Sequence, residues 1–483
     1  MGVVAMANRP VSNESDPALA ALGRAFEHAR THLGALDVAP TGATADLATL
    51  RARLSRPLPE HGLDAVQVID ELVADVSGGL LGSASGRFFG WVIGGSLPSA
   101  TAADWLASVW DQNAALHACA PAAAVVEEVA GAWARALLSL PEHASFALTT
   151  GCQMAHFTCL AAARHALLAA RDWDVEERGL HGAPRLRILT SDAAHGSIER
   201  AARLLGLGRA TLRVLPSNDE ARLSVETLSR ALDEARGEAT IVVLQAGDIN
   251  TGTFDDFATL IPIAHAAGAW VHVDGAFGLW AAASPSKRPF ILGVEDADSW
   301  ATDAHKWLNV PYDCGLAFVS QPQAHRAAMS HRASYLTHDP IARDQLDWNP
   351  DWSRRARGFA LYAALRELGR DQLAAMIDRT CEHARALVDG MAHIPGATVL
   401  WRPTLNQGLV RFESSAPGAT EADHDRRTDA VIARVVASGE AFFGGTTWRS
   451  KRAMRISVCN WRTSERDVAR AIAAVEKAAS VHG

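Results

Sequence analysis

The sequence predicts an α/β protein with a mainly parallel central sheet covered by helices. The first indication is that short apolar runs alternate with helix-like segments from about residue 146 to residue 320. The second is size and composition. The chain has 483 residues, of which 48% are hydrophobic and 21% charged, as in a globular protein with a large core. In such sheets ligands bind at the carboxyl ends of the strands, so we look for a site there.

The elements of this central region follow one another in a regular order. A short strand begins at Phe146 and runs into a small-residue turn that ends at Cys152. The further strand-like runs are Leu186–Thr190, Ile241–Leu244 and Trp270–Val273. Helical periodicity is found at Ala122–Leu140, Met154–Arg171 and Phe257–Gly268.

The flanking segments predict two smaller units around a large central domain at 96–370. Residues 1–95 are expected to form a helical arm used for dimerisation, and 371–483 a small α+β domain. Amphipathic periodicity in the arm covers Asp16–Leu36 and Leu63–Val76. The C-terminal candidates are a linking helix from Ser353 to Gly369, strands within Val399–Phe412 and Ala453–Val458, and helices at Arg426–Ser438 and Ser464–Ala479.

Charge and cysteine content exclude several classes of function. The net charge is −8, so no basic excess points to a nucleic-acid partner. The six cysteines show no CxxC spacing and are expected to be reduced thiols of a cytoplasmic protein. The first ten residues lack the basic start of a signal peptide, and no apolar run reaches eighteen residues. We therefore expect a cytoplasmic protein without a membrane partner.

Two charged residues stand in apolar surroundings and suggest a cofactor. The run Trp270–Val273 leads directly into Asp274, and Lys306 lies some thirty residues later between His305 and Trp307. Both charges are costly to bury without partners. A carboxylate that keeps a pyridine nitrogen protonated and an amine that forms a Schiff base are what a pyridoxal phosphate site requires.

Four sequence blocks resemble the group II amino-acid decarboxylases, which are pyridoxal-phosphate enzymes of fold type I. The blocks are TTGCQ, SDAAHGSIER, HVDGAF and DSWATDAHKW, and the resemblance extends from about Phe88 to the C-terminus. It implies a fold-type-I architecture and decarboxylation of an L-amino acid. It also implies an intertwined homodimer with the active site at the subunit interface.

The resemblance also assigns roles to single residues. Lys306 is expected to bind the cofactor's aldehyde, Asp274 its ring nitrogen, and His195 and Ala276 its two faces. A strand that turns into a helix N-terminus is a ready anion site. The residues expected around the phosphate are Thr150, Gly151, Cys152, Asp303, His305 and Ser353. No metal is expected.

A substrate pocket is expected along two further segments. It would include Trp91, Ile93 and Gly94, and also His117, which stands where the aromatic-amino-acid enzymes have Trp. Another departure is Asp248-Ile249, at positions where relatives carry hydroxyl groups near the cofactor.

One difference from the decarboxylases leaves the reaction open. The segment from Leu336 to Arg354 lacks the tyrosine that protonates the reaction intermediate in those enzymes; Tyr335 precedes it, and His338 is a candidate substitute. The alternatives are an aldehyde synthase, an aldolase or lyase, or an aminotransferase on the same scaffold. A further alternative is a catalytically idle dimer that binds pyridoxal phosphate.

Overall fold

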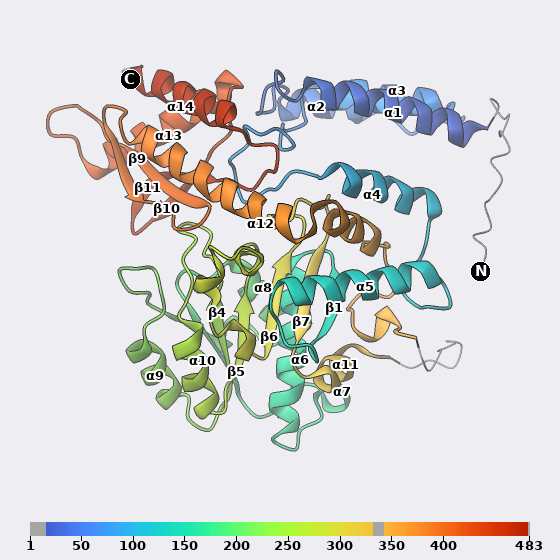
Figure 1. Cartoon of the computed structure of the whole chain (residues 1–483), viewed down its shortest axis with the longest axis vertical. Coiled ribbons are helices and arrows are strands. Elements are labelled where there is room, and N and C mark those ends of the chain that lie inside the picture. The colour runs from blue at the N-terminus through green and yellow to red at the C-terminus, as the bar shows by residue number, and fades with distance from the viewer. Residues whose placement is uncertain (1–15, 332–341, 482–483) are drawn as a thin grey trace.

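A seven-stranded sheet forms the centre of the molecule (Figure 1). The computed structural model describes residues 16–331 and 342–481. The strand order is β1-β7-β6-β5-β4-β2-β3, and only β7 runs antiparallel to its two neighbours. The strands are β1 (Ser145–Thr149), β2 (Leu186–Ser191), β3 (Leu212–Leu215), β4 (Ala239–Gln245), β5 (Trp270–Asp274), β6 (Ser299–Asp303) and β7 (Gly315–Val319). The predicted α/β class with a mainly parallel sheet is confirmed.

Helices cover both faces of this sheet, and alternate residues of β4 point into two different cores. Ile241 and Val243 join the core formed with α6 and α8, whereas Val242 and Leu244 face the core formed with α9 and α10. A strand buried on both faces reads as a continuous apolar run, which is why β4 lacks polar alternation. The covering helices are α5 (Pro121–Leu137), α6 (Cys152–Ala169), α7 (Val175–Arg178), α8 (Gly196–Leu204), α9 (Val225–Glu234), α10 (Phe257–Ala266) and α11 (Pro322–Met329).

The N-terminal helices lie along one edge of the molecule, away from the sheet (Figure 1). They are α1 (Pro17–Ala35), α2 (Leu47–Leu54) and α3 (Ala65–Val76), and they contain no buried residue. Helix α4 (Pro98–Trp110) follows them and packs on α12 (Gly358–Met391). Arg24 and His28 of α1 both reach Asp70 of α3, at 2.5 and 2.6 Å. The helices predicted at Asp16–Leu36 and Leu63–Val76 are present as α1 and α3, and α2 was missed.

The C-terminal part is a small antiparallel sheet with helices packed on it. Helix α12 (Gly358–Met391) leads into it and leaves helical geometry at Gly369, where φ is 56°. The segment predicted to be strand-like at Val399–Phe412 contains most of two antiparallel strands that pair with each other. The elements are β8 (Ala397–Trp401), β9 (Gln407–Phe412), β10 (Gly444–Trp448), β11 (Lys451–Ser457), α13 (Glu421–Ser438) and α14 (Glu465–Ser480). The domain boundaries near residues 95 and 370 stay predictions.

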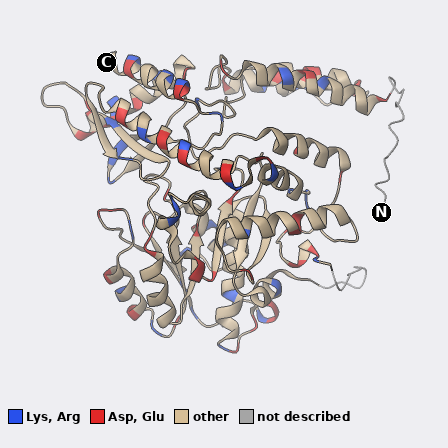
Figure 2. Cartoon of the chain, viewed as in Figure 1, with Lys and Arg blue, Asp and Glu red and all other residues tan. Residues whose placement is uncertain are grey.

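Charges are distributed unevenly over the helices (Figure 2). Blue and red residues alternate along α12 and α14, whereas α4 and α5 are mostly tan. No helix among residues 16–331 and 342–481 is long and apolar enough to cross a membrane.

Candidate active site

Two neighbouring parallel strands each end on a buried carboxylate. Asp274 is the last residue of β5 and Asp303 the last residue of β6, and the two strands pair with Asp274 opposite Ala301. The side chains are therefore brought to the same edge of the sheet. Asp274 is 4% exposed and Asp303 is 2% exposed. Two buried negative charges so close together need compensation.

Asp303 obtains that compensation from within the protein. Its Oδ2 lies 3.1 Å from Nζ of Lys306, and its Oδ1 accepts a hydrogen bond of 2.6 Å from the backbone N–H of Cys152. Burial alone would lower the pKa of Lys306. The nearby charge of Asp303, to which that of Asp274 adds, raises the pKa above its ordinary value instead. The Lys306 amine is thus an ammonium group held against Asp303.

Asp274 has no such cation. Its Oδ1 accepts a hydrogen bond of 3.2 Å from the backbone N–H of Ala276, and Nε2 of His156 lies 3.6 Å away. Burial lowers the pKa of His156 to about 3, so this imidazole is neutral at physiological pH. No Lys or Arg within the described parts of the chain forms an ion pair with Asp274. Its charge is therefore available to a cation that a ligand brings.

The backbone around Lys306 is fixed by close contacts. A Cβ added at Gly94 would lie 1.8 Å from the carbonyl oxygen of Lys306, so only glycine allows this approach. Asn309 has a φ of 57°, and its Oδ1 accepts hydrogen bonds from the N–H groups of Gly95 and Trp461. Three segments far apart in sequence are therefore tied together behind the lysine.

The turn before α6 supplies the start of a helix next to the two carboxylates. Gly151 is the N-cap residue of α6, and a Cβ added at Gly315 would lie 2.5 Å from the Cα of Gly151. His305 is 8% exposed; its Nδ1 accepts the N–H of Cys314, and its Nε2 lies 3.6 Å from Asp303. Burial lowers the pKa of His305.

These groups fit pyridoxal phosphate. The cofactor has an aldehyde, a basic ring nitrogen and a dianionic phosphate. The site offers an amine at Lys306, an uncompensated carboxylate at Asp274 and the N-terminus of α6 next to both. The model for the pyridoxal-dependent decarboxylase conserved domain matches residues 48–413. The chain belongs to this family.

Individual relatives agree with the family assignment. Histidine decarboxylase of Mus musculus is 28% identical over 381 residues, which cover 75% of this chain and 55% of that enzyme. The chain thus spans about half the length of that relative. Phenylacetaldehyde synthase of Arabidopsis thaliana is 26% identical over 432 residues, 87% of each protein. Aromatic-L-amino-acid decarboxylase of Bacillus atrophaeus is 23% identical over 447 residues, 90% of each.

Solved structures show the same fold. The Oryza sativa TDC crystallised with PLP and tryptamine superposes with a TM-score of 0.90 at 24% identity and covers 98% of this chain and 99% of its own. Mouse CSAD gives 0.87 at 22% identity and covers 97% and 99%. The family, the fold class, the carboxy-lyase class and the cofactor predicted from the sequence are confirmed.

Three other residues expected in the decarboxylase site differ in their exposure and hydrogen bonds. His195 follows β2, is exposed, and its Nδ1 lies 2.9 Å from Oγ of Ser197, where it caps α8. Thr150 is partly exposed next to Gly151. Ser353 is exposed and makes no hydrogen bond within the described residues. The roles of these residues stay predictions.

The residues expected in the substrate pocket come from two separate segments. Trp91 is 48% exposed and packs on Phe442 of the C-terminal part, with ring centroids 5.1 Å apart. Ile93 is half-buried beside Gly94. His117 is half-buried, and its backbone N–H donates to Asp344. His338 and Tyr335 lie outside the described residues.

The departure at Asp248-Ile249 has a local explanation. Asp248 is buried and accepts hydrogen bonds from the N–H groups of Asn250 and Thr251 and from the Thr251 hydroxyl. Ile249 packs on the main core. The carboxylate therefore stabilises its own turn.

Two buried histidines behind Asp274 were missed from the sequence. His156 is on α6 and His272 on β5, and both are fully buried. A signal was available: residues two apart in a strand face the same side, so His272 had to share a face with Asp274. The buried pair of Arg354 and Glu127, 3.1 Å apart, was missed for lack of any local pattern.

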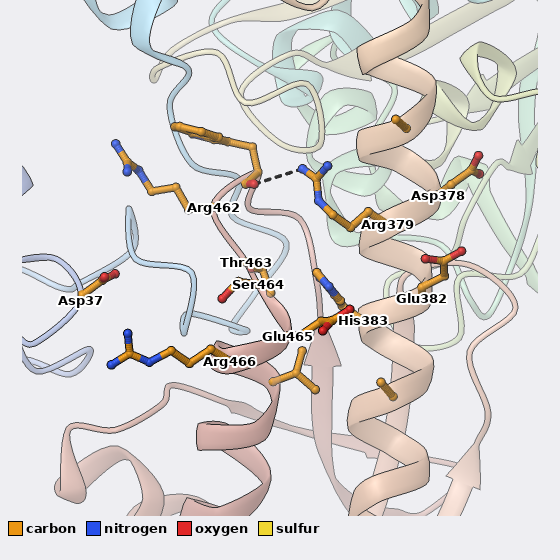
Figure 3. Close-up of a pocket in the computed structure, with 14 residues that line it drawn as sticks. Asp37, Asp378, Arg379, Glu382, His383, Arg462, Thr463, Ser464, Glu465 and Arg466 are labelled. Atoms are coloured by element: carbon orange, nitrogen blue, oxygen red, sulfur yellow. Dashed lines mark hydrogen bonds between the residues drawn. The ribbon is translucent and has the colours of Figure 1, made fainter.

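A separate cavity of about 1260 Å³ lies between α12 and the start of α14 (Figure 3). Arg379, His383 and Glu465 line it, and Arg379 donates to the carbonyl oxygen of Trp461. Neither Lys306 nor Asp274 is part of this lining, so the cavity is distinct from the cofactor site.

Proposed function

We propose that the chain removes the carboxyl group of an L-amino acid with pyridoxal phosphate bound to Lys306. One observation carries the proposal: a half-buried lysine stands beside two buried strand-end carboxylates, of which Asp303 is paired with it and Asp274 is not. A site with one spare buried negative charge is suited to a cationic ring nitrogen.

Each group would have a defined task. Bound pyridoxal phosphate supplies an electron sink for the pair released at Cα. Asp274 holds the proton at the ring nitrogen, since its negative charge raises the pKa of that nitrogen. Nζ of Lys306 binds the aldehyde carbon, and Asp303 orients Nζ. His195 and Ala276 cover the two ring faces.

The phosphate would lie at the start of α6. Thr150, Gly151 and Cys152 form the turn, and His305 lies beside it. The N–H of Cys152 already donates to Asp303 in this structure. The remaining first-turn N–H groups and the helix dipole would hold the phosphate. Ser353 would also lie near the phosphate.

The substrate side chain would lie toward Trp91, Ile93, Gly94 and His117. Relatives are named as histidine, tyrosine and aromatic-amino-acid decarboxylases. Solved structures of the same fold are described as a tryptophan decarboxylase and a glutamate decarboxylase domain. Histidine, tyrosine, tryptophan and glutamate are therefore the first substrates to test.

Aldehyde formation is the second candidate. The segment from Leu336 to Arg354 contains no tyrosine, and one relative is named phenylacetaldehyde synthase. Purified holoprotein is given each amino acid under air and under argon, and CO2, ammonia and aldehyde are measured. CO2 with amine and no oxygen dependence supports decarboxylation. Ammonia and aldehyde formed only under air support the second candidate. Amino-group transfer, Cα–Cβ cleavage or no turnover would contradict both.

Replacement of Lys306 tests the assignment of the amine. Lys306→Ala is expected to lose turnover by at least about a thousandfold, because Lys306 is the lysine paired with Asp303 among residues 16–331 and 342–481. It should also lose the visible absorbance of the bound cofactor. Lys287→Ala, a buried lysine outside the site, is the matched control and should retain both. Full activity in Lys306→Ala would refute the proposal.

We further propose that the protein forms a homodimer and lies in the cytoplasm. Helices α1 and α3 expose Leu19, Phe26 and Leu72, each at least 50% accessible, and α4 exposes Trp110 at 47%. Apolar residues gathered on adjoining helices favour an interface with a second copy. The six cysteines are unpaired, as in a reducing compartment. Light scattering at two protein concentrations would test the dimer; a monomer at both would contradict it.

A further inference from the structure

Behind Asp274 a chain of polar side chains crosses the core from β6 to α6. Nε1 of Trp270 donates to Oγ of Ser299, and Nδ1 of His272 lies 2.9 Å from the same oxygen. Nε2 of His272 lies 2.9 Å from Nδ1 of His156. The chain then reaches Asp274, where Nε2 of His156 is 3.6 Å from Oδ1.

The last nitrogen of this chain is unusual. Nε2 of His156 is buried and has no hydrogen-bond partner within the described residues. A buried polar group left unpaired destabilises the folded protein, so it calls for an explanation. The separation of 3.6 Å is longer than a hydrogen bond. Contacts of this kind are often long before a ligand binds and shorten afterwards.

The direction of the hydrogen bonds follows from the carboxylate end of the chain. The indole of Trp270 donates to Ser299, whose hydroxyl keeps its own hydrogen for Nδ1 of His272. Nε2 of His272 then carries a hydrogen and donates to Nδ1 of His156. Nε2 of His156 in turn carries the hydrogen that faces Asp274. The opposite direction would turn a lone pair toward the carboxylate, which is unfavourable.

Both imidazoles stay neutral in this arrangement. Burial lowers the pKa of His156 and of His272 to about 3. A neutral donor can stabilise the anionic form of Asp274 without bringing a compensating positive charge. The carboxylate therefore keeps its ability to pair with a cation.

We propose that His156 is a positioning residue that donates its Nε2 hydrogen to Asp274 and so keeps the shared proton on the cofactor's ring nitrogen. His272 and Ser299 fix the tautomer of His156. Without the donor, the desolvated carboxylate would take up the proton itself and leave a neutral pair. The proposal rests on the role of Asp274 in the proposed function.

A metal ion is the competing explanation of the unpaired nitrogen. The thiol of Cys152, the imidazole of His156 and the carboxylate of Asp274 have ligand atoms within 4.8 Å of one another. Metal binding requires a thiolate. Burial, and then the charges of Asp303 and Asp274, raise the pKa of Cys152, which opposes that form.

The test compares the affinity of the apoprotein for pyridoxal phosphate with its affinity for the 1-deaza analogue, which lacks the ring nitrogen. The ratio of the two dissociation constants reports only on contacts at that nitrogen. In His156→Leu the preference for pyridoxal phosphate should fall about tenfold, the size expected for a lost hydrogen bond to a charged group. His156→Gln, whose amide can still donate, should stay within about threefold of the wild type.

His325 provides the matched control. It is fully buried, its pKa is also lowered to about 3 by burial, and it bonds Ser145 and the carbonyl of Trp348 far from Asp274. His325→Leu should leave the preference unchanged. Ser299→Ala, which frees the tautomer of His272, is the second variant if His156→Leu fails to fold, and it should weaken the preference by a few fold.

The outcomes separate the hypotheses. Equal losses for both ligands in His156→Leu, or an equal change in His325→Leu, would overturn the role of His156. A stoichiometric metal in purified wild-type protein that is lost in His156→Leu would overturn it in favour of a metal site. Wild-type protein without any preference for pyridoxal phosphate would instead refute the role of Asp274 in the proposed function.

Discussion

Asp274 and Asp303 occupy equivalent places at the ends of adjacent strands but differ in what compensates their charge. Asp303 contacts the ammonium of Lys306 and the N–H of Cys152. Asp274 has one backbone N–H and a neutral imidazole nearby. Both are almost fully buried, so solvent does not account for the difference. The fold therefore compensates one carboxylate itself and leaves the other available to a ligand.

The largest loss of activity is expected on replacement of Asp274. Asp274→Asn removes the charge that would hold a proton on the ring nitrogen. Loss of one partner of a buried charge pair costs about 3–5 kcal/mol, so kcat/KM should fall about a thousandfold. Steady-state kinetics with the best amino acid of the panel measure this.

Asp378→Asn is the control for this substitution. That carboxylate accepts hydrogen bonds from Ser284 and Ser286 outside the site and should affect kcat/KM little. A loss of less than about tenfold in Asp274→Asn would break the distinction between the two strand-end carboxylates.

A smaller effect is expected at Asp303, the compensated carboxylate. Its replacement should change the pH dependence of cofactor uptake. The charge of Asp303 raises the pKa of Lys306, so Asp303→Asn should lower that pKa. Only the unprotonated amine can bind the cofactor's aldehyde. The rate at which the apoprotein takes up pyridoxal phosphate should therefore rise at lower pH in the variant than in the wild type. Stopped-flow absorbance from pH 6 to 10 measures the shift, and movement toward higher pH would contradict it.

The last expected effect concerns stability in acid and not catalysis. Burial places the pKa of His156 at about 3, below the ordinary value of 6.5. The unfolded chain therefore binds a proton that the folded protein does not, between about pH 6.5 and pH 3. The contribution of each such histidine to the free energy of unfolding is largest above pH 6.5. It falls by about 1.4 kcal/mol per pH unit as the pH decreases through this window.

His156→Gln should remove the contribution of one histidine to the slope of the free energy of unfolding against pH. Urea unfolding at pH 6, 5 and 4 measures it, and His325→Gln should behave alike because the two imidazoles are buried to the same extent. A slope that stays the same in both variants would show that these histidines are not buried in the neutral form.

The sequence predicted those parts of the molecule that depend on neighbours along the chain. Asp274 and Lys306 were found because a strand end and an apolar neighbourhood are local patterns. Strand β3 was missed because this edge strand is only partly buried and lacks a strong apolar run. His156 was missed because its meaning depends on β5, more than a hundred residues away. The pairing of Asp303 with Lys306 likewise became clear only from the distance between their side chains.

The most direct measurement is a crystal structure of the protein with pyridoxal phosphate bound. The cofactor's aldehyde carbon should be joined to Nζ of Lys306. The ring nitrogen should lie about 2.7–2.9 Å from an oxygen of Asp274, the usual length of a charge-assisted hydrogen bond. A ring nitrogen that faces Asp303 or solvent, with Asp274 left uncompensated, would contradict it.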